Sequence, residues 1–163
     1  MKFFDYYKSP LGNMVIMEED NAIIRLSLCT QKSEFLESSY SPDPMSHATT
    51  TLIENAKAQL TDYFQGTRQI FDLPLNPSGT SFQKKVWQAL CQIPYGQTRS
   101  YKEIALAIDN PKGCRAVGMA NNRNPIMLII PCHRVIGSNG TLVGYAGGLD
   151  IKEWLLEHEK GHG

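Results

Sequence analysis

The first thirty residues alternate between hydrophobic and polar positions in the manner of β-strands. Residues 2–8, 13–18 and 22–28 alternate or run apolar and are rich in β-forming side chains. Turn signals, Leu11-Gly12 and Asp20-Asn21, stand between them. Short runs separated by such turns are typical of strands paired with their neighbours in sequence. This part of the chain therefore predicts a small antiparallel sheet.

A helical period replaces this alternation farther along the first half. Over 49–64 apolar side chains recur at helical spacing, and Gly66 is placed to end the helix. Residues 31–39 predict a shorter helix, which the turn-forming residues 41–44 terminate. The stretch 73–79, Leu-Pro-Leu-Asn-Pro-Ser-Gly, has the composition of a linker.

The second half has mainly helical patterns. The first predicted helix is capped by Thr80 or Ser81 and ends before Pro94, and the second runs from a capping box of Ser100 and Glu103 through Ala107. The third covers 113–122. The fourth begins at a capping box of Asp150 and Glu153 and runs to about Glu159. The apolar run 126–129 predicts a buried strand, and the turn 138–140 predicts a hairpin. This order matches a helix-turn-helix with an added wing. We therefore expect an α/β domain over 1–78 and a mostly α, winged helix-turn-helix-like domain over 79–163.

Composition describes an ordinary soluble protein, with 42% hydrophobic and 20% charged residues among 163. No apolar stretch approaches the roughly 20 residues that a membrane helix needs. The beginning of the chain has Asp5 where a signal peptide would continue its apolar core. The four cysteines are widely spaced and form no Cys-x-x-Cys pair. We expect a reduced, cytoplasmic protein that does not contact membranes.

Charge is unevenly distributed although the net charge is zero. Up to residue 79 the chain has six basic and ten acidic residues, a net charge of −4, and the remainder has ten against six, a net charge of +4. Such asymmetry is expected when one half of a protein meets phosphate groups. The excess is modest, so it predicts a salt-sensitive but moderate affinity for DNA.

A candidate nucleophile, Cys132, follows the apolar run and stands beside His133. Pro131 fixes its own φ and lacks a backbone donor, which favours a turn where the thiol emerges. The thiolate is the reactive form of cysteine, and a neighbouring imidazole commonly produces it near neutral pH. An isolated buried cysteine is more often an inert small hydrophobe. The context of Cys132 therefore decides between the two interpretations.

That context resembles the O6-alkylguanine-DNA alkyltransferase family. The similarity lies in Pro131–Val135, Gly144–Gly148, Lys152–Leu156, Arg115–Gly118 and Asn124-Pro125, and it is close over about 80–160 and faint before 78. The resemblance implies a ribonuclease H-like first domain. It also implies a DNA repair protein that moves an alkyl group, mainly methyl, from guanine O6 in duplex DNA to its own Cys132, once and irreversibly.

The resemblance also assigns DNA-binding residues. Helix 113–122 would enter the minor groove, where Gly118 permits close approach and Asn122 lies on the same outer face. Arg115 would fill the gap left by the extruded guanine, because a planar cation can take the place of a base. Tyr101 would press on the phosphate of the target nucleotide. By itself, this helix would be interpreted as an ordinary one in which Ala116, Val117 and Ala120 face the core.

Alkyl transfer depends on a predicted relay from Glu159 through His133 and a bridging water to Cys132. The stripe formed by Ile151, Trp154, Leu155 and His158 faces inward, which places Glu159 close to the buried side, where a carboxylate needs a partner. The family assigns the same roles. The resemblance further implies that Asn124 tethers the turn at the cysteine and that the phenol of Tyr145 assists departure of O6. It also implies that the carbonyl of Val135 binds the exocyclic amine and that the backbone amides of Ala146 and Gly147 approach the base.

No cofactor and no metal are expected, because the first half offers only Cys29 and His47 as soft ligands. We expect a monomer. Three other functions fit parts of the sequence: a non-catalytic damage-binding protein, which would lack Cys132, a winged-helix regulator, which would dimerise and carry a more basic helix, and a cysteine hydrolase. A hydrolase normally draws its base from elsewhere in the sequence.

Overall fold

The computed structural model describes residues 1–29, 45–142, 145 and 148–162. The chain divides into two compact units, Met1–Pro77 and Ser78–Gly163. The helix expected over 31–39 lies outside the described residues, and so do the site residues Ala146 and Gly147.

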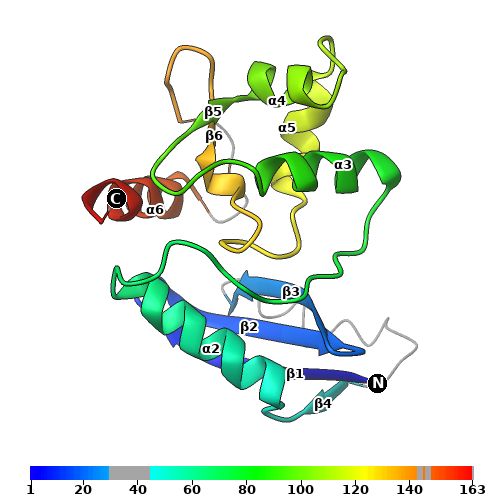
Figure 1. Cartoon of the computed structure of the whole chain (residues 1–163), viewed down its shortest axis with the longest axis vertical. Coiled ribbons are helices and arrows are strands. Elements are labelled where there is room, and N and C mark those ends of the chain that lie inside the picture. The colour runs from blue at the N-terminus through cyan, green and yellow to red at the C-terminus, as the bar shows by residue number, and fades with distance from the viewer. Residues whose placement is uncertain (30–44, 143–144, 146–147, 163) are drawn as a thin grey trace. The chain divides into compact units, whose positions relative to one another are not determined.

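The first unit contains a four-stranded sheet with the order β3-β2-β1-β4 (Figure 1). Strands β1 (Lys2–Ser9), β2 (Gly12–Glu19) and β3 (Ala22–Leu28) form an antiparallel meander, which confirms the three predicted strands. A short fourth strand, β4 (Met45–His47), pairs in parallel with β1. The sheet is therefore mixed rather than purely antiparallel.

Helix α2 (Thr51–Phe64) lies across this sheet (Figure 1). Its N-terminus is capped by Thr50, whose side chain accepts a hydrogen bond from the Ile53 amide at 3.2 Å. Gly66, with φ of 82°, donates to the Tyr63 carbonyl at 3.0 Å and ends the helix as predicted. The core of the unit consists of the apolar side chains Met14, Ile16, Ile23, Leu26, Ile53, Ala56, Leu60 and Tyr63, all fully buried.

The segment predicted as a linker is partly bound to the sheet. Ile23 of β3 donates to the Pro74 carbonyl and accepts from the Asn76 amide, both at 2.8 Å. Leu75 thereby forms a bridge on the outer edge of β3. The pairing covers backbone groups of an edge strand that would otherwise be open.

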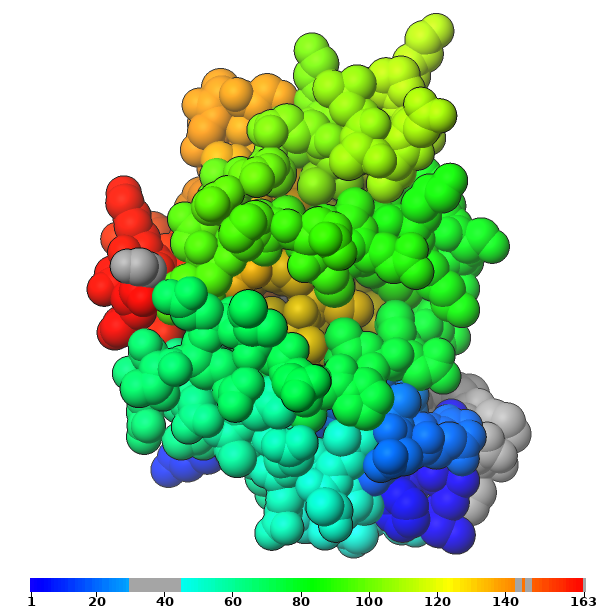
Figure 2. All heavy atoms as spheres, in the orientation of Figure 1, coloured from blue at the N-terminus to red at the C-terminus, as the bar shows by residue number. Residues whose placement is uncertain are grey.

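The second unit is mostly helical, as expected. It contains α3 (Ser81–Leu90), α4 (Tyr101–Ala107), α5 (Cys114–Asn122) and α6 (Leu149–Gly161). Thr80 and Ser100 cap α3 and α4 through capping boxes with Gln83 and Glu103. The turn between α4 and α5, residues 109–112, lies at the surface (Figure 2).

Three expectations for this unit were wrong in detail. The apolar run 126–129 forms a turn rather than a strand, with Leu128 at φ of 70° and the Ile130 amide bonded to the Ile126 carbonyl at 3.1 Å. A turn does form at 138–140, but strand β6 (Val135–Ile136) pairs in parallel with β5 (Arg99–Ser100) instead of forming a hairpin arm. Helix α6 begins after Gly148, which provides no side-chain cap, so Asp150 lies inside its first turn.

A polar cluster around Asp5 ties together three elements of the first unit. The Asp5 carboxylate accepts hydrogen bonds from Lys57 Nζ of α2 at 2.5 Å, from His47 Nε2 of β4 at 2.8 Å and from the Thr49 hydroxyl. Burial alone would raise the pKa of Asp5, but these bonds outweigh it and hold that pKa well below its usual range.

We expect Asp5→Asn to lower the free energy of unfolding by about 1.5–3 kcal/mol at pH 7, because charged hydrogen bonds are lost. A carboxyl whose folded pKa is depressed stabilises the fold above its unfolded pKa, and this contribution declines as the pH falls through the folded pKa. The difference from wild type should therefore shrink near pH 3 when urea unfolding is followed by circular dichroism. Asp62→Asn, at an exposed carboxylate, is the control and should change little. A difference that is equal at both pH values would contradict this account.

Candidate active site

Cys132 lies in a tight turn immediately before β6. Residues Cys132–Arg134 form one turn of 3-10 helix after Pro131, and the Cys132 amide donates to the Ile130 carbonyl at 2.8 Å. The Arg134 amide donates to the Pro131 carbonyl at 3.0 Å. The Cys132 side chain is only 5% exposed. The thiol is therefore fixed by its backbone and nearly withdrawn from solvent.

Asn124 holds the turn that precedes the cysteine. Its Nδ2 donates to the Ile130 carbonyl at 2.7 Å, and its Oδ1 accepts from the Ile126 amide at 3.0 Å. One amide side chain thus satisfies two backbone groups of a buried apolar turn. The sequence predicted that Asn124 tethers the turn at the cysteine, and these two hydrogen bonds join Asn124 to that turn.

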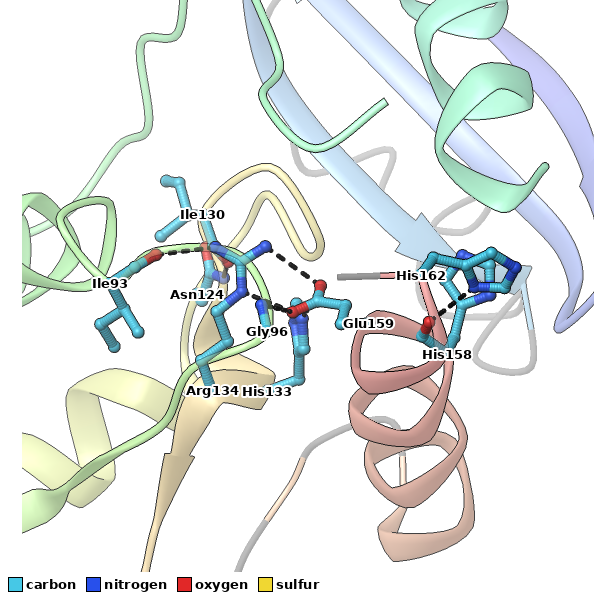
Figure 3. Close-up of polar contacts among 9 residues, drawn as sticks. All are labelled: Ile93, Gly96, Asn124, Ile130, His133, Arg134, His158, Glu159 and His162. Carbon is cyan, nitrogen blue, oxygen red and sulfur yellow. Dashed lines mark hydrogen bonds and ion pairs between the residues drawn. The ribbon is translucent and has the colours of Figure 1, made fainter. Parts of the chain in front are cut away.

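Glu159 is the centre of a buried polar group (Figure 3). Its Oε2 accepts a hydrogen bond from His133 Nε2 at 2.6 Å. Arg134 donates to both carboxylate oxygens, from Nε at 2.7 Å and from Nη2 at 3.0 Å. The same guanidinium donates through Nη1 to the Ile93 carbonyl at 2.8 Å. Helix α6 is thereby joined to the turn that carries Cys132.

Arg134 was not singled out in the sequence, although it stands next to His133. Burial alone would raise the pKa of Glu159, but the hydrogen bonds from His133 and Arg134 hold that pKa well below its usual range. A buried carboxylate needs more than one neutral donor to remain ionised. A buried carboxylate indicates that a positively charged side chain lies nearby, but sequence spacing alone could not identify which lysine or arginine it is.

His133 is completely buried, and burial lowers the pKa of its imidazole despite the adjacent Glu159. The positive charges of Arg134 and Lys152 lower this pKa further. Since the carboxylate only accepts hydrogen bonds, Nε2 of the neutral ring carries the proton. The other nitrogen, Nδ1, is buried and makes no hydrogen bond with the part of the chain that the structure describes. It is therefore an acceptor on the side of the ring away from Glu159.

Burial disfavours ionisation of the Cys132 thiol, whereas a neighbouring imidazole was expected to favour it. Burial raises the pKa of Cys132, and four contributions oppose that shift without cancelling it: hydrogen bonds from Asn124, from Tyr145 and from the Cys132 backbone, and the positive charge of Lys152. His133 is adjacent in sequence but bonds to Glu159 instead.

Lys152 is the second functional residue that sequence reasoning missed. Its side chain is fully buried in α6, and Nζ lies 5.8 Å from the ring centroid of Tyr101 and 5.9 Å from that of Tyr145. Aromatic faces attract a cation at such distances. Burial lowers the pKa of Lys152, and the proximity of Cys132 opposes that change. In the sequence Lys152 stands beside Glu153 near the start of a helix, and this pattern did not indicate that the lysine is buried near Cys132.

The residues predicted to read DNA lie on or beside α5. Arg115 and Asn122 are exposed, and Gly118 faces Tyr101, whose ring would be 3.8 Å from a Cβ at position 118. Burial and the neighbouring Cys132 raise the pKa of Tyr101, which places its phenol near the thiol.

Two assignments of side chains to the core were wrong. Ala116 of α5 is exposed, whereas Asn121 is buried in its place, 1% exposed. Trp154 of α6 is 37% exposed and stacks on His158 with ring centroids 4.9 Å apart. Val117, Ala120 and Leu155 are buried as expected.

The remaining site residue in the described part of the second unit is Val135. It is fully buried in β6, and its amide donates to the Cys132 carbonyl. The structure therefore brings Asn124, Tyr145, Lys152 and Tyr101 close to the Cys132 sulfur. The hydrogen-bonded pair of His133 and Glu159 begins at the next residue of the same turn.

Two family models match the chain with no large gap between them. The 6-O-methylguanine DNA methyltransferase ribonuclease-like domain covers residues 2–77, and the DNA binding domain of the same family covers 81–161. The chain belongs to the 6-O-methylguanine DNA methyltransferase family. The first of these matches falls where the resemblance in sequence was faint, and it agrees with the expected α/β domain.

Relatives and solved structures in this family are similar over nearly the whole chain. A methylated-DNA--protein-cysteine methyltransferase of Methanosarcina barkeri is 48% identical, covering 97% of each chain. The constitutive one of Bacillus subtilis is 45% identical, covering 98% of this chain and 96% of its own. The O6-methylguanine methyltransferase of Mycobacterium tuberculosis superposes with a TM-score of 0.87 at 42% identity, covering 100% of this chain and 95% of its own. A structure of the M. tuberculosis OGT in complex with DNA gives the same TM-score at 40% identity, covering 98% and 94%.

Among the residues that the structure describes, no three His, Cys, Asp or Glu side chains gather closely enough to hold a metal ion. None of the described helices combines the length and apolar character required to cross a membrane. The absence of a cofactor stays a prediction.

We expect the folded protein to react with iodoacetamide at Cys132 with a pH midpoint above that of the same residue in urea, because burial raises the pKa of the thiol. Lys152→Met should move the midpoint still higher, because a cation that favours the thiolate is lost. Peptide mass spectrometry separates Cys132 from the other three cysteines, and the midpoint is independent of reduced access to the buried sulfur. Lys160→Met, at an exposed position of the same helix, is the matched control. A midpoint below that of the unfolded chain would refute this description.

Proposed function

We propose that this protein repairs DNA by moving the alkyl group of O6-alkylguanine, mainly methyl, to its own Cys132. Family membership supports the reaction, and the observation that carries it to particular atoms is the buried Cys132 in the same turn as His133, whose ring is hydrogen-bonded to Glu159 at 2.6 Å. In this proposal residues 79–163 perform both DNA binding and transfer, and residues 1–78 form the other domain.

The transfer begins with loss of the Cys132 proton. His133 Nδ1 has acceptor capacity, and a bridging water carries the proton from the sulfur to it, because the two side chains are adjacent in sequence and point apart. The imidazolium that forms is stabilised by Glu159. Arg134 keeps that carboxylate ionised, so Glu159 stabilises the charge without taking the proton.

The sulfur then attacks the alkyl carbon. A new S–C bond forms as the C–O6 bond breaks, and its electron pair stays on the guanine oxygen. Tyr145 donates a hydrogen bond to that oxygen as negative charge develops, and Lys152 lies 5.9 Å from the Tyr145 ring as a nearby positive charge. Val135 presents its carbonyl to the exocyclic amine, and the backbone amides of Ala146 and Gly147 approach the base.

The product explains why the protein acts once. A thioether is a poor leaving group, unlike the thioester of a cysteine hydrolase, so water does not release the alkyl group. Each molecule is consumed by one transfer, and it acts as a stoichiometric reagent.

DNA must be distorted for this chemistry, because a 5% exposed thiol cannot reach an atom inside the base stack. In the proposed complex α5 enters the minor groove, with Gly118 permitting close approach and Asn122 at the same surface. Arg115 occupies the gap left by the guanine, and Tyr101 presses on the target phosphate. The protein works as a monomer in the cytoplasm.

Incubation with duplex DNA holding one O6-methylguanine should add the mass of one methylene group to Cys132, with no turnover beyond one equivalent. Intact-mass and peptide mass spectrometry measure both results. Cys132→Ala should retain DNA binding and lose transfer completely. Release of alkyl product in excess of protein would instead indicate a hydrolase.

Arg115→Ala should slow transfer from duplex DNA by about 10- to 100-fold, because unfilled space raises the cost of extruding the base by a few kcal/mol. Transfer from the free base O6-benzylguanine requires no extrusion and should be nearly unchanged. Lys160→Ala removes one exposed positive charge from α6 and serves as the control for general electrostatics. Equal losses with both substrates would exclude the assigned role of Arg115.

A further inference from the structure

Asn121 is a buried amide that the reaction described above does not use. It is the second-last residue of α5 and is 1% exposed. Its Nδ2 donates to the backbone carbonyl of Cys132 at 3.3 Å. The helix that carries Arg115 and Asn122 on its exposed face therefore contacts the nucleophile directly through one side chain.

The hydrogen bond from Asn121 to the Cys132 carbonyl is not needed to satisfy the backbone of the fold. The Cys132 carbonyl already accepts the Val135 amide, so it would remain satisfied without Asn121. The other end of the Asn121 amide, Oδ1, is buried and has no hydrogen-bond partner among the described residues. Burying an unsatisfied acceptor costs free energy that an apolar side chain of the same size would avoid. Polar residues that lower stability are concentrated at functional positions.

Helix α5 is held firmly at the same end. Trp87 of α3 donates from Nε1 to the Ala120 carbonyl at 2.9 Å, and Val117 and Ala120 are buried beside it. A packed helix moves as a unit rather than bending locally. Asn121 therefore joins a firmly packed helix to the Cys132 carbonyl.

We propose that Asn121 is a positioning residue that couples contact between DNA and α5 to the placement of the Cys132 sulfur. The inference rests on the proposed function, since it presupposes transfer from duplex DNA. When α5 binds the duplex, the amide fixes the turn so that the sulfur faces the extruded base. A free base is not part of a duplex bound to α5, so the hydrogen bond from Asn121 contributes little to transfer from it.

The decisive measurement is the ratio of transfer rates from duplex O6-methylguanine and from free O6-benzylguanine. In Asn121→Leu this ratio should fall about tenfold, the size of a typical coupling between two sites. The unfolding midpoint should stay the same or rise, because the buried acceptor is gone. Asn121→Ser, too short to reach the Cys132 carbonyl, should lower the ratio equally and covers the case in which the leucine variant fails to fold.

Val117→Ala is the matched control, because it loosens packing of the same helix and makes no hydrogen bond to Cys132. It should lower the unfolding midpoint and leave the ratio unchanged. An unchanged ratio in both Asn121 variants would overturn the inference, whatever their stability. If the wild-type protein itself transfers nothing from duplex DNA, the proposed function fails instead, so the two failures are distinguishable.

Discussion

The second unit depends on one buried carboxylate, that of Glu159. Water is excluded from it, and an unpaired charge there would be incompatible with folding. The fork of Arg134 and the ring of His133 supply three short hydrogen bonds from a turn that lies 25 residues earlier in the chain. Helix α6 and the nucleophile turn are therefore fixed to each other by the same contacts that set the protonation of the histidine. Structure and chemistry share one constraint.

Burial favours the neutral forms of both His133 and Cys132. Such a resting state suits a protein that can react only once. Because the thiolate is the reactive form, a low thiolate fraction protects Cys132 from stray electrophiles. Tyr145, Asn124 and Lys152 all favour the thiolate, and burial outweighs them at rest. The groups that assist ionisation are thus already in place, and in the proposed reaction the remaining step is proton transfer to His133.

Sequence reasoning recovered what depends on local patterns and motifs. The helical period identified α2, a capping residue identified the start of α3, and a capping box identified the start of α4. Family motifs pointed to Cys132, His133 and Glu159, and the last two are hydrogen-bonded to each other. It missed Arg134, Lys152 and Asn121, because each is a polar residue whose burial is decided by partners far away in the chain. The run 126–129 was misassigned because a short buried apolar segment has no period to distinguish a strand from a turn. Strand β4 is three residues long and pairs with β1 across more than 35 residues, so no local signal marks it.

Recognition and chemistry are also close together along the chain. Asn122 at the end of α5 is exposed, Asn121 before it touches the Cys132 backbone, and Asn124 after it ties the turn leading to the cysteine. Within four consecutive residues, one side chain is therefore exposed and two are hydrogen-bonded to the backbone of the turn that carries Cys132. An exposed helix face selects for small and polar side chains, whereas a core selects for apolar ones. Asn121 satisfies neither preference, and its position between the two surfaces is the physical reason to regard it as a connection rather than as packing.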